Sequence, residues 1–419
     1  MSERSSRIES IDALRGLVMV VMVLDHARHS LTLFGNPENV ATTTPLLFLT
    51  RWVTHFCAPV FVFLAGTSAF LYGRRRSRGD ASRFLVTRGL WLLVLELTVI
   101  TFVVMHGLQI LFWQVIAAIG VSMIALAALL WLPRWALVVV GVALVAGQDA
   151  CRDWGDGTTG VWADAWRLLH GSWARPTFGI VQSPIGPILP VYPVLPWIGV
   201  MALGYATGGL LGGDDRDRRR RWLSLGAALL LAFFVVRLLD GWGNARPFWA
   251  QREQGADWIA LLACEKYPPS LAYALMTLGP AMLLLAWFER APGPVQRWLQ
   301  MFGRVPMFFY IVHHALVHGT AVAMFWLRDG QGVHLIQAEL SFLAPAGLAD
   351  VDFEPLPQGF QGFGLGAAYL VTVACVLLLW PMCRWYDRVK QRSRSVWLSY
   401  LQGHLQAVRL RPLQPATVA

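Results

Sequence analysis

Long apolar runs follow one another along the whole chain, separated by polar stretches that are mostly short. A bilayer core about 30 Å thick takes about 20 residues of helix, so we expect about ten membrane-spanning helices. The expected spans are 10–33, 48–72, 83–105, 108–131, 134–149, 190–211, 222–239, 270–289, 298–326 and 362–386. The pattern predicts an all-α, polytopic transmembrane helix bundle in which residues 1–419 form a single domain.

The composition supports a membrane protein and excludes an ordinary soluble domain. Of the 419 residues, 56% are hydrophobic and only 14% are charged. The net charge of +10 would suggest nucleic-acid binding in a soluble protein, but most of the cations lie in short loops between apolar runs. We therefore expect contact with membrane lipids and no nucleic-acid partner.

Basic clusters predict the orientation in the membrane. They follow even-numbered spans and comprise Arg74, Arg75, Arg76, Arg78, Arg216 and Arg218 to Arg221. Because such clusters are retained in the cytoplasm, we expect both termini, including a basic tail at about 387–419, to be cytoplasmic. We expect the long segments 150–189, 240–269 and 327–361 to be extracytoplasmic, where they could roof a cavity. The first span has no signal-peptide cleavage site, which leads us to expect that it is not cleaved.

The first expected span carries ionisable residues, which normally face the interior of a helix bundle and mark a functional pathway. Arg15 and His26 are eleven residues apart, so they share one helix face to within about 20° and are separated by about 16 Å along the axis. This spacing places Arg15 near the cytoplasmic surface and His26 in the outer half of the bilayer. The alternative is an arginine that reaches lipid head groups and a histidine satisfied by a neighbouring helix.

Further histidines are expected at the same depth as His26. Arg51 and His55 stand four residues apart near the outer end of the second span, and His314 and His318 are one turn apart in FGRVPMFFYIVHHALVHG. His313 is expected to point about 100° away from His314. Agreement in depth among three spans favours one shared site.

Two residues of CAPVFVFLAG have structural interpretations. Pro59 is expected to kink the second span, because proline removes a backbone hydrogen bond. Gly66 is expected to allow a close approach between helices.

A metal site is not expected. A histidine pair at i, i+4 can bind zinc, but HHALVH lacks the glutamate of a metalloprotease helix and no carboxylate is spaced as a third ligand. Cys57, Cys375 and Cys383 are expected to pack within spans. Cys151 and Cys264 fall in outer loops and could pair if the compartment is oxidising.

Several strings resemble one family. They are RIESIDALRGLVMVVMVLDHARHSL, THFCAPVFVFLAG, YPVLPWIGVMALGY, CEKYPPSLAYALMTLGP, FGRVPMFFYIVHH and CRWYDRVKQRSRSVWLSYL. Together they are similar to the bacterial branch of the heparan-alpha-glucosaminide N-acetyltransferase-like proteins. The resemblance implies a multi-span enzyme of a bacterial inner membrane. Such an enzyme takes an acetyl group from acetyl-CoA on one side of the membrane and delivers it to an amino sugar on the other.

The sequence departs from the family at one position and agrees with a wider group at another. The lysosomal member is thought to use a histidine in its first luminal loop, and residues 30 to 54 here contain none. Membrane acyltransferases of bacterial surface glycans resemble this chain in having Arg-Gly at the start of the first span and a histidine eleven residues after that arginine. Arg15, Gly16 and His26 match this spacing.

We therefore expect a transmembrane O- or N-acyltransferase that moves an acetyl group from cytoplasmic acetyl-CoA to an extracytoplasmic glycan or glycolipid. His26 is the expected base or acyl carrier, with Asp25 or a partner from another span orienting its ring. The candidates for stabilising the oxyanion are His55, His314 and Tyr310. The candidates for binding the CoA phosphates are Arg15, Arg88 and Arg304, and those for the acceptor are Arg28, Arg51, Lys266, Tyr267, Tyr310 and His318.

Two other functions compete with this interpretation. A proton-coupled transporter would use the histidines and Glu96 as a relay, although the sequence shows no matching halves with broken helices. A non-catalytic membrane protein of the same fold would have lost the site. The sequence leaves the acceptor, the acyl chain length and any homo-oligomer open.

Overall fold

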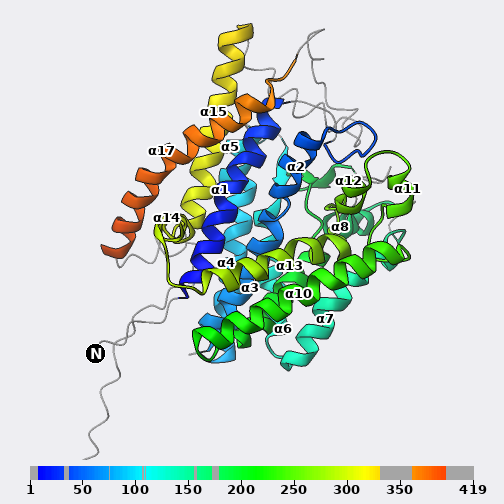
Figure 1. Ribbon diagram of the computed structural model, residues 1–419, viewed down its shortest axis with the longest axis vertical. Coiled ribbons are helices and arrows are strands. Elements are labelled where there is room, and N and C mark those ends of the chain that lie inside the picture. The colour runs from blue at the N-terminus through cyan, green and yellow to red at the C-terminus, as the bar shows by residue number, and fades with distance from the viewer. Residues whose placement is uncertain are drawn as a thin grey trace, which may run out of the picture.

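Helices make up most of the computed structural model, which describes residues 8–32, 37–74, 76–105, 108, 110–154, 158–171, 179–330 and 361–392 (Figure 1). The helices of the N-terminal half are α1 (Glu9–Thr32), α2 (Pro45–Thr54), α3 (Cys57–Gly73), α4 (Arg78–Leu95), the π-helix η1 (Glu96–Ile100), α5 (Thr101–Met105), α6 (Val115–Leu129), α7 (Arg134–Ala146), η2 (Gln148–Cys151), α8 (Val161–His170), α9 (Leu195–Thr207) and η3 (Gly208–Leu211). The C-terminal half contributes α10 (Asp215–Leu239), α11 (Phe248–Arg252), α12 (Asp257–Leu262), α13 (Leu271–Phe288), α14 (Pro294–Gly303), α15 (Pro306–Asp329) and α17 (Leu365–Arg392).

Six helical segments among the described residues are long and apolar enough to cross a membrane. They are Pro45–Gly73, Arg78–Met105, Asp215–Leu239, Leu271–Phe288, Pro306–Asp329 and Leu365–Arg392. Shorter apolar helices occur at Val115–Leu129, Arg134–Ala146 and Leu195–Leu211. A helix therefore occupies each of the ten expected ranges, while the number of membrane crossings and the cytoplasmic location of the termini stay predictions.

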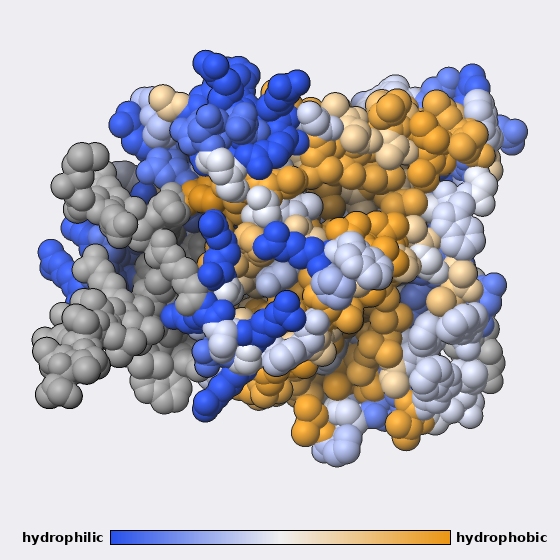
Figure 2. Space-filling view, turned by 90° about the horizontal axis from the view of Figure 1, so that it is seen from below, coloured by the Kyte–Doolittle hydropathy of each residue, from blue (hydrophilic) through white to orange (hydrophobic). Residues whose placement is uncertain are grey.

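Large apolar side chains remain exposed on the helices that line the outside of the bundle, as lipid contact requires. Examples are Leu231 on α10, Val139 on α7 and Leu377 on α17, each more than half exposed. In Figure 2 such apolar surface spreads across much of the visible face and is bordered by hydrophilic groups.

The expected span 48–72 is divided into α2 and α3, and proline explains the division. Pro59 cannot donate a hydrogen bond to the carbonyl four residues earlier, which belongs to His55. The Tyr273 hydroxyl of α13 donates to that carbonyl instead, at 2.8 Å. The helix is thus interrupted one turn before Pro59, as the sequence predicted.

The expected span 298–326 is wrong as a single helix. It is two helices, α14 and α15, joined at Arg304 and Val305. Pro306 takes one of the first positions of α15, where its missing N–H costs no hydrogen bond.

The all-α prediction omitted one small sheet. Its strands are β1 (Leu111–Trp113), β2 (Val181–Ser183) and β3 (Gly186–Pro190), in the order β1-β3-β2. β1 pairs with β3 in parallel, and β2 pairs with β3 in antiparallel orientation. The sheet joins the segment before α6 to the loop before α9.

Helix α1 packs against α14, α15, α17, α13 and α3, so its polar residues face other helices. Glycines allow the closest contacts elsewhere in the bundle. A Cβ at Gly66 of α3 would clash with the Met201 carbonyl of α9, and one at Gly204 would clash with the Phe63 carbonyl. The packing role predicted for Gly66 is confirmed.

All five cysteines are free thiols in the structure. Cys57, Cys375 and Cys383 are buried within helices, as expected. Cys151 and Cys264 are not paired, so the disulfide considered from the sequence is not formed here.

Candidate functional site

Three histidine rings from α1 and α15 meet inside the bundle. His26 Nδ1 lies 2.8 Å from His313 Nε2, and the two ring planes differ by only 15°. The ring of His314 lies 4.1 Å from that of His26 and 4.3 Å from that of His313, measured between centroids. His313 and His314 are buried, whereas His26 is partly accessible.

Backbone carbonyls fix the proton positions in this cluster. His313 Nδ1 lies 2.9 Å from the Phe309 carbonyl, which can only accept, so a neutral His313 carries its proton on Nδ1. Its Nε2 then accepts the Nδ1–H of His26. A neutral His26 consequently has its lone pair on Nε2, where it can act as a base.

The same logic applies to His314, whose Nδ1 lies 2.9 Å from the Tyr310 carbonyl. Its Nε2 is then an acceptor, so neutral His314 does not offer the donor that an oxyanion needs. The ring of Tyr310 lies 4.5 Å from that of His314, and its hydroxyl donates to Gln114 Oε1 at 3.1 Å. His318 stacks on His314 at a centroid distance of 6.1 Å.

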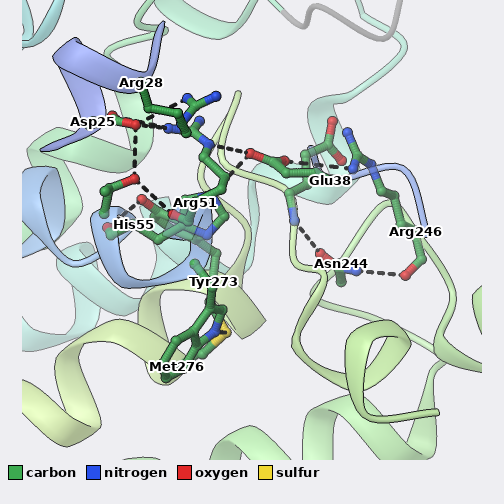
Figure 3. Close-up of polar contacts among 12 residues, drawn as sticks. Asp25, Arg28, Glu38, Arg51, His55, Asn244, Arg246, Tyr273 and Met276 are labelled. Carbon is green, nitrogen blue, oxygen red and sulfur yellow. Dashed lines mark hydrogen bonds and ion pairs between the residues drawn. The ribbon is translucent and has the colours of Figure 1, made fainter. Parts of the chain in front are cut away.

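A buried network of charges begins beside His26. The Asp25 carboxylate accepts hydrogen bonds from Arg51 at 2.9 and 3.1 Å, from Arg28 at 3.2 Å and from the Thr54 hydroxyl at 2.9 Å (Figure 3). These contacts join α1 to α2. They also occupy Asp25, whereas His26 Nδ1 lies in hydrogen-bond contact with His313, a residue of another helix.

Glu38 extends this network beyond the helices. It accepts from Arg51 Nε at 2.9 Å, lies 3.0 Å from His55 Nε2 and pairs with Arg246 at 3.7 Å (Figure 3). Burial raises the pKa of the Glu38 carboxyl, but Arg51 and His55 outweigh it and hold that pKa well below its ordinary value. His55 therefore belongs to the charge network, and its ring contacts Tyr273.

Lys266 and Tyr267 lie where the chain enters α13. The Lys266 Nζ lies 5.0 Å from the centre of the Tyr267 ring and 5.7 Å from that of Tyr192. Burial raises the pKa of the Tyr267 phenol, but Lys266 and Arg51 outweigh it and hold that pKa below its ordinary value. The charges of this loop and of the network around Arg51 are thus close enough to influence one another.

The three arginines expected to bind CoA lie on three different elements. Arg15 of α1 is buried and donates to Asp12 at 3.1 Å and to the Ser68 hydroxyl at 3.1 Å. Arg88 of α4 is buried. Arg304, between α14 and α15, keeps about a third of its side chain exposed, at 34%, and lies 3.7 Å from Asp387.

The structure brings some of the predicted residues together and separates others. His26, His314, His318 and Tyr310 contact one another or share a neighbour. Asp25, Arg28, Arg51 and His55 form the adjoining network.

The sequence did not assign His313, Glu38 or Arg246 to the site. His313 was expected to point away from His314 and was left out of the cluster, yet its Nε2 lies 2.8 Å from His26 Nδ1. The signal for His313 was its position next to His314. Because neighbouring residues on a helix point about 100° apart, both rings can lie on the side of the helix that packs against another helix. Glu38 could have been noted as the acidic residue of the short segment between the first two spans.

The sequence matches the family described as "Heparan-alpha-glucosaminide N-acetyltransferase, catalytic" over residues 7–237. This range includes α1, the charge network on α2, the helices that follow and most of α10. A search of curated proteins finds no match.

Proposed function

We propose, from the premise that this chain belongs to the heparan-alpha-glucosaminide N-acetyltransferase family, that it transfers an acetyl group from cytoplasmic acetyl-CoA to an extracytoplasmic glycan or glycolipid. Family membership and the six apolar helices make the protein an integral membrane acyltransferase. The donor, the acceptor, the side of the membrane and the choice between nitrogen and oxygen acceptors are parts of the proposal.

The hydrogen bond between His26 and His313 is the observation that supports this function most strongly. A base must hold its lone pair towards the acceptor, and the carbonyl of Phe309 sets this arrangement through His313. We assign His26 as the catalytic base and His313 as its positioning residue. Base catalysis of this kind contributes about 10²- to 10⁴-fold.

The transfer proceeds in two proton movements. His26 Nε2 takes the proton of the acceptor amine or hydroxyl as that atom attacks the thioester carbonyl. The carbon–sulfur bond then breaks, and the imidazolium returns the proton to the leaving thiolate of CoA. In the covalent alternative, His26 Nε2 attacks the thioester carbonyl, the carbon–sulfur bond breaks and CoA leaves as the thiolate. The acceptor then attacks the acetyl-imidazole, the bond from Nε2 to the acetyl carbon breaks, and the acceptor's proton passes through the freed Nε2 to the thiolate.

Charge develops on the carbonyl oxygen during either route, and Tyr310 is the best placed of the three expected donors. Its ring packs against His314 of the histidine cluster and it carries an O–H donor, whereas His55 contacts Glu38 and neutral His314 presents an acceptor. Tyr310 would exchange its hydrogen bond to Gln114 for one to the oxyanion.

Arginine pairs with phosphate in forked geometry, which supports Arg15, Arg88 and Arg304 as contacts for CoA. Arg15 lies eleven residues from His26 on the continuous helix α1, about 16 Å along the axis. A CoA molecule entering from the Arg15 end would thus extend towards the histidine cluster.

The acceptor side of the site would be the charge network. Arg28, Arg51, Lys266 and Tyr267 offer donors around Asp25 and Glu38, which suits the hydroxyl and amine groups of a sugar. His318, which stacks on His314, would be a further contact for the acceptor.

The experiment measures transfer from radiolabelled acetyl-CoA by the full chain purified in detergent, with amino sugars and glycans as acceptors. His26→Ala should abolish transfer while the protein remains monodisperse. His313→Leu should lower kcat by about 10- to 100-fold with little change in KM for acetyl-CoA, because the lone pair of His26 is no longer directed.

His313→Gln provides the matched control, since its amide oxygen can accept the Nδ1–H of His26. It should recover part of the lost kcat. Transfer by His26→Ala at the wild-type rate would refute the proposed base, and equal loss in His313→Leu and His313→Gln would refute the positioning role.

A further inference from the structure

The three-histidine cluster also has the composition of a metal site. The ligand nitrogens of His26, His313 and His314 all lie within 4.8 Å of one another. The sequence did not suggest such a site, because the expected pair was His314 and His318 on one helix. The third ring comes from α1, which only the packing of α1 against α15 brings close.

Two of the three rings are held as metal-binding histidines commonly are. His313 and His314 each direct Nδ1 to the carbonyl one turn earlier, at 2.9 Å. Such a bond fixes the ring and leaves Nε2 as the nitrogen that can bind a metal. The orientation needed of a ligand is therefore already present in both residues.

The distances require only small movements. Tetrahedral zinc with Zn–N bonds of 2.0–2.1 Å separates its ligand nitrogens by about 3.3 Å. The nitrogens of His26 and His313, now 2.8 Å apart, must separate by about half an ångström. The two ligand nitrogens that lie furthest apart are at most 4.8 Å from each other and must approach by up to about 1.5 Å. Rotation of one side chain provides this movement.

The donor set selects the class of ion. Three neutral imidazoles suit Zn²⁺ and its neighbours Co²⁺, Ni²⁺ and Cu²⁺, whereas Mg²⁺ and Ca²⁺ prefer oxygen. Three histidine ligands leave a fourth position for water or another small ligand.

We propose that His26, His313 and His314 form a Zn²⁺ site, and that the bound ion prevents His26 from acting as a base. The ion would take the lone pair of His26 Nδ1, so that the proton of the neutral ring moves to Nε2. Nε2 then has no lone pair for the acceptor. Metal binding needs only the cluster, whereas the inhibition rests on the proposed function.

The first experiment measures binding without any substrate. The full chain in detergent is stripped with a chelator and titrated with Zn²⁺ by calorimetry, and with Co²⁺ as a spectroscopic probe of tetrahedral nitrogen ligation. We expect one ion per chain. Loss of a residue that only hydrogen-bonds to a metal ligand weakens binding by about 10- to 100-fold. His314→Ala removes a ligand itself, so it should weaken Zn²⁺ binding by more than this.

His29→Ala is the matched control, because His29 is an exposed histidine on the same helix α1. It should bind Zn²⁺ as the wild type does. Size-exclusion profiles and melting temperatures establish that His314→Ala is folded. Zn²⁺ binding of equal affinity in folded His314→Ala and wild type, or no binding to the wild type, would overturn the metal site.

The second experiment follows initial rates of acetyl transfer, before released CoA thiol can bind the metal. Zn²⁺ should inhibit over the same concentration range in which it binds, and a chelator should restore the rate. Stimulation, or an unchanged rate at saturating Zn²⁺, would overturn the antagonism. If the metal-free protein transfers no acetyl group, the proposed function fails while the binding experiment keeps its meaning.

Discussion

Two buried carboxyl groups outside the membrane-spanning helices have opposite surroundings. Glu38 is enclosed by Arg51, His55 and Arg246, and its pKa lies well below the ordinary value of 4.5. Glu265 is 5% exposed, and burial raises its pKa to about 7 although Arg246 partly offsets the effect. Such shifts make folding stability depend on pH, with opposite signs for the two residues.

We predict that the stabilisation by Glu38 is present above pH 4.5 and is lost as the pH falls through the lowered pKa of the folded protein. Glu38→Gln should therefore unfold at a lower temperature than wild type at pH 7, by an amount equivalent to about 3 kcal/mol, because a buried pair loses one partner. This difference should shrink below pH 4.5. Melting curves in detergent between pH 3.5 and pH 8 measure it.

Glu265→Gln is the comparison variant and should behave in the opposite way. A raised pKa in the folded state favours folding below the ordinary value of 4.5 and opposes it as the pH rises through about 7. Glu265→Gln should thus gain melting temperature over wild type at pH 8 and lose that gain at pH 4.5. Parallel pH dependence in the two variants would contradict the assigned surroundings.

At the scale of single residues, the sequence identified His26 because an ionisable residue in an apolar run is unusual in itself. His313 was missed for a physical reason. The rotation of α15 about its axis is set by packing against α1, and the direction of a single ring depends on that rotation. Glu38 was missed because Arg51 lies in α2, His55 directly after α2 and Arg246 in the loop before α11, and no local pattern brings these residues together.

At the scale of elements, the break between α2 and α3 shows how one residue changes two helices. Pro59 frees the His55 carbonyl, and Tyr273 of α13 donates to it at 2.8 Å. The break allows His55 to contact Glu38 on one side and Tyr273 on the other. The kink could be predicted from Pro59, whereas the partner on α13 could not, because it lies 218 residues further along the chain.

We predict that Tyr273→Phe destabilises the protein by about 1–2 kcal/mol, since a buried carbonyl loses its donor. In Pro59→Ala the new backbone N–H can donate to that carbonyl, so Tyr273→Phe should cost about 1 kcal/mol less in this background. Unfolding of the two single variants and the double variant in denaturant gives the coupling.

Tyr205→Phe on α9 serves as the control, because it removes a hydroxyl that plays no part in this bond. Its effect should be the same in the wild type and in the Pro59→Ala background. An equal cost of Tyr273→Phe in both backgrounds would show that the hydroxyl does not replace the missing backbone donor.

At the scale of the whole molecule, the positions of the basic segment and of the short helices α11 and α12 predict a direction for the proposed transfer. Arginines from Arg216 to Arg221 begin α10, and α11 and α12 follow its other end. Val40, Phe48, Phe248 and Ile259 form one apolar cluster, so α11 and α12 lie on the same side as Glu38 and α2 (Figure 1). The positive-inside rule then predicts that the charge network lies on the extracytoplasmic side.

We predict that a cysteine in the first turn of α10 and one directly after α11 are accessible from opposite sides of the membrane. Arg216 and Glu253 are both exposed, and one lies in the first turn of α10 while the other directly follows α11. In a Cys151→Ser background, which removes the only native cysteine that is not buried, a membrane-impermeant maleimide should label Glu253→Cys in intact spheroplasts. Arg216→Cys should react only after the membrane is opened, because its flanking arginines hold that end in the cytoplasm. Labelling of Arg216→Cys from outside would mean that the charge network around Glu38, which lies beside His26, faces the cytoplasm. Acetyl-CoA is also cytoplasmic, so donor and acceptor would then be on the same side, and transfer across the membrane would be excluded.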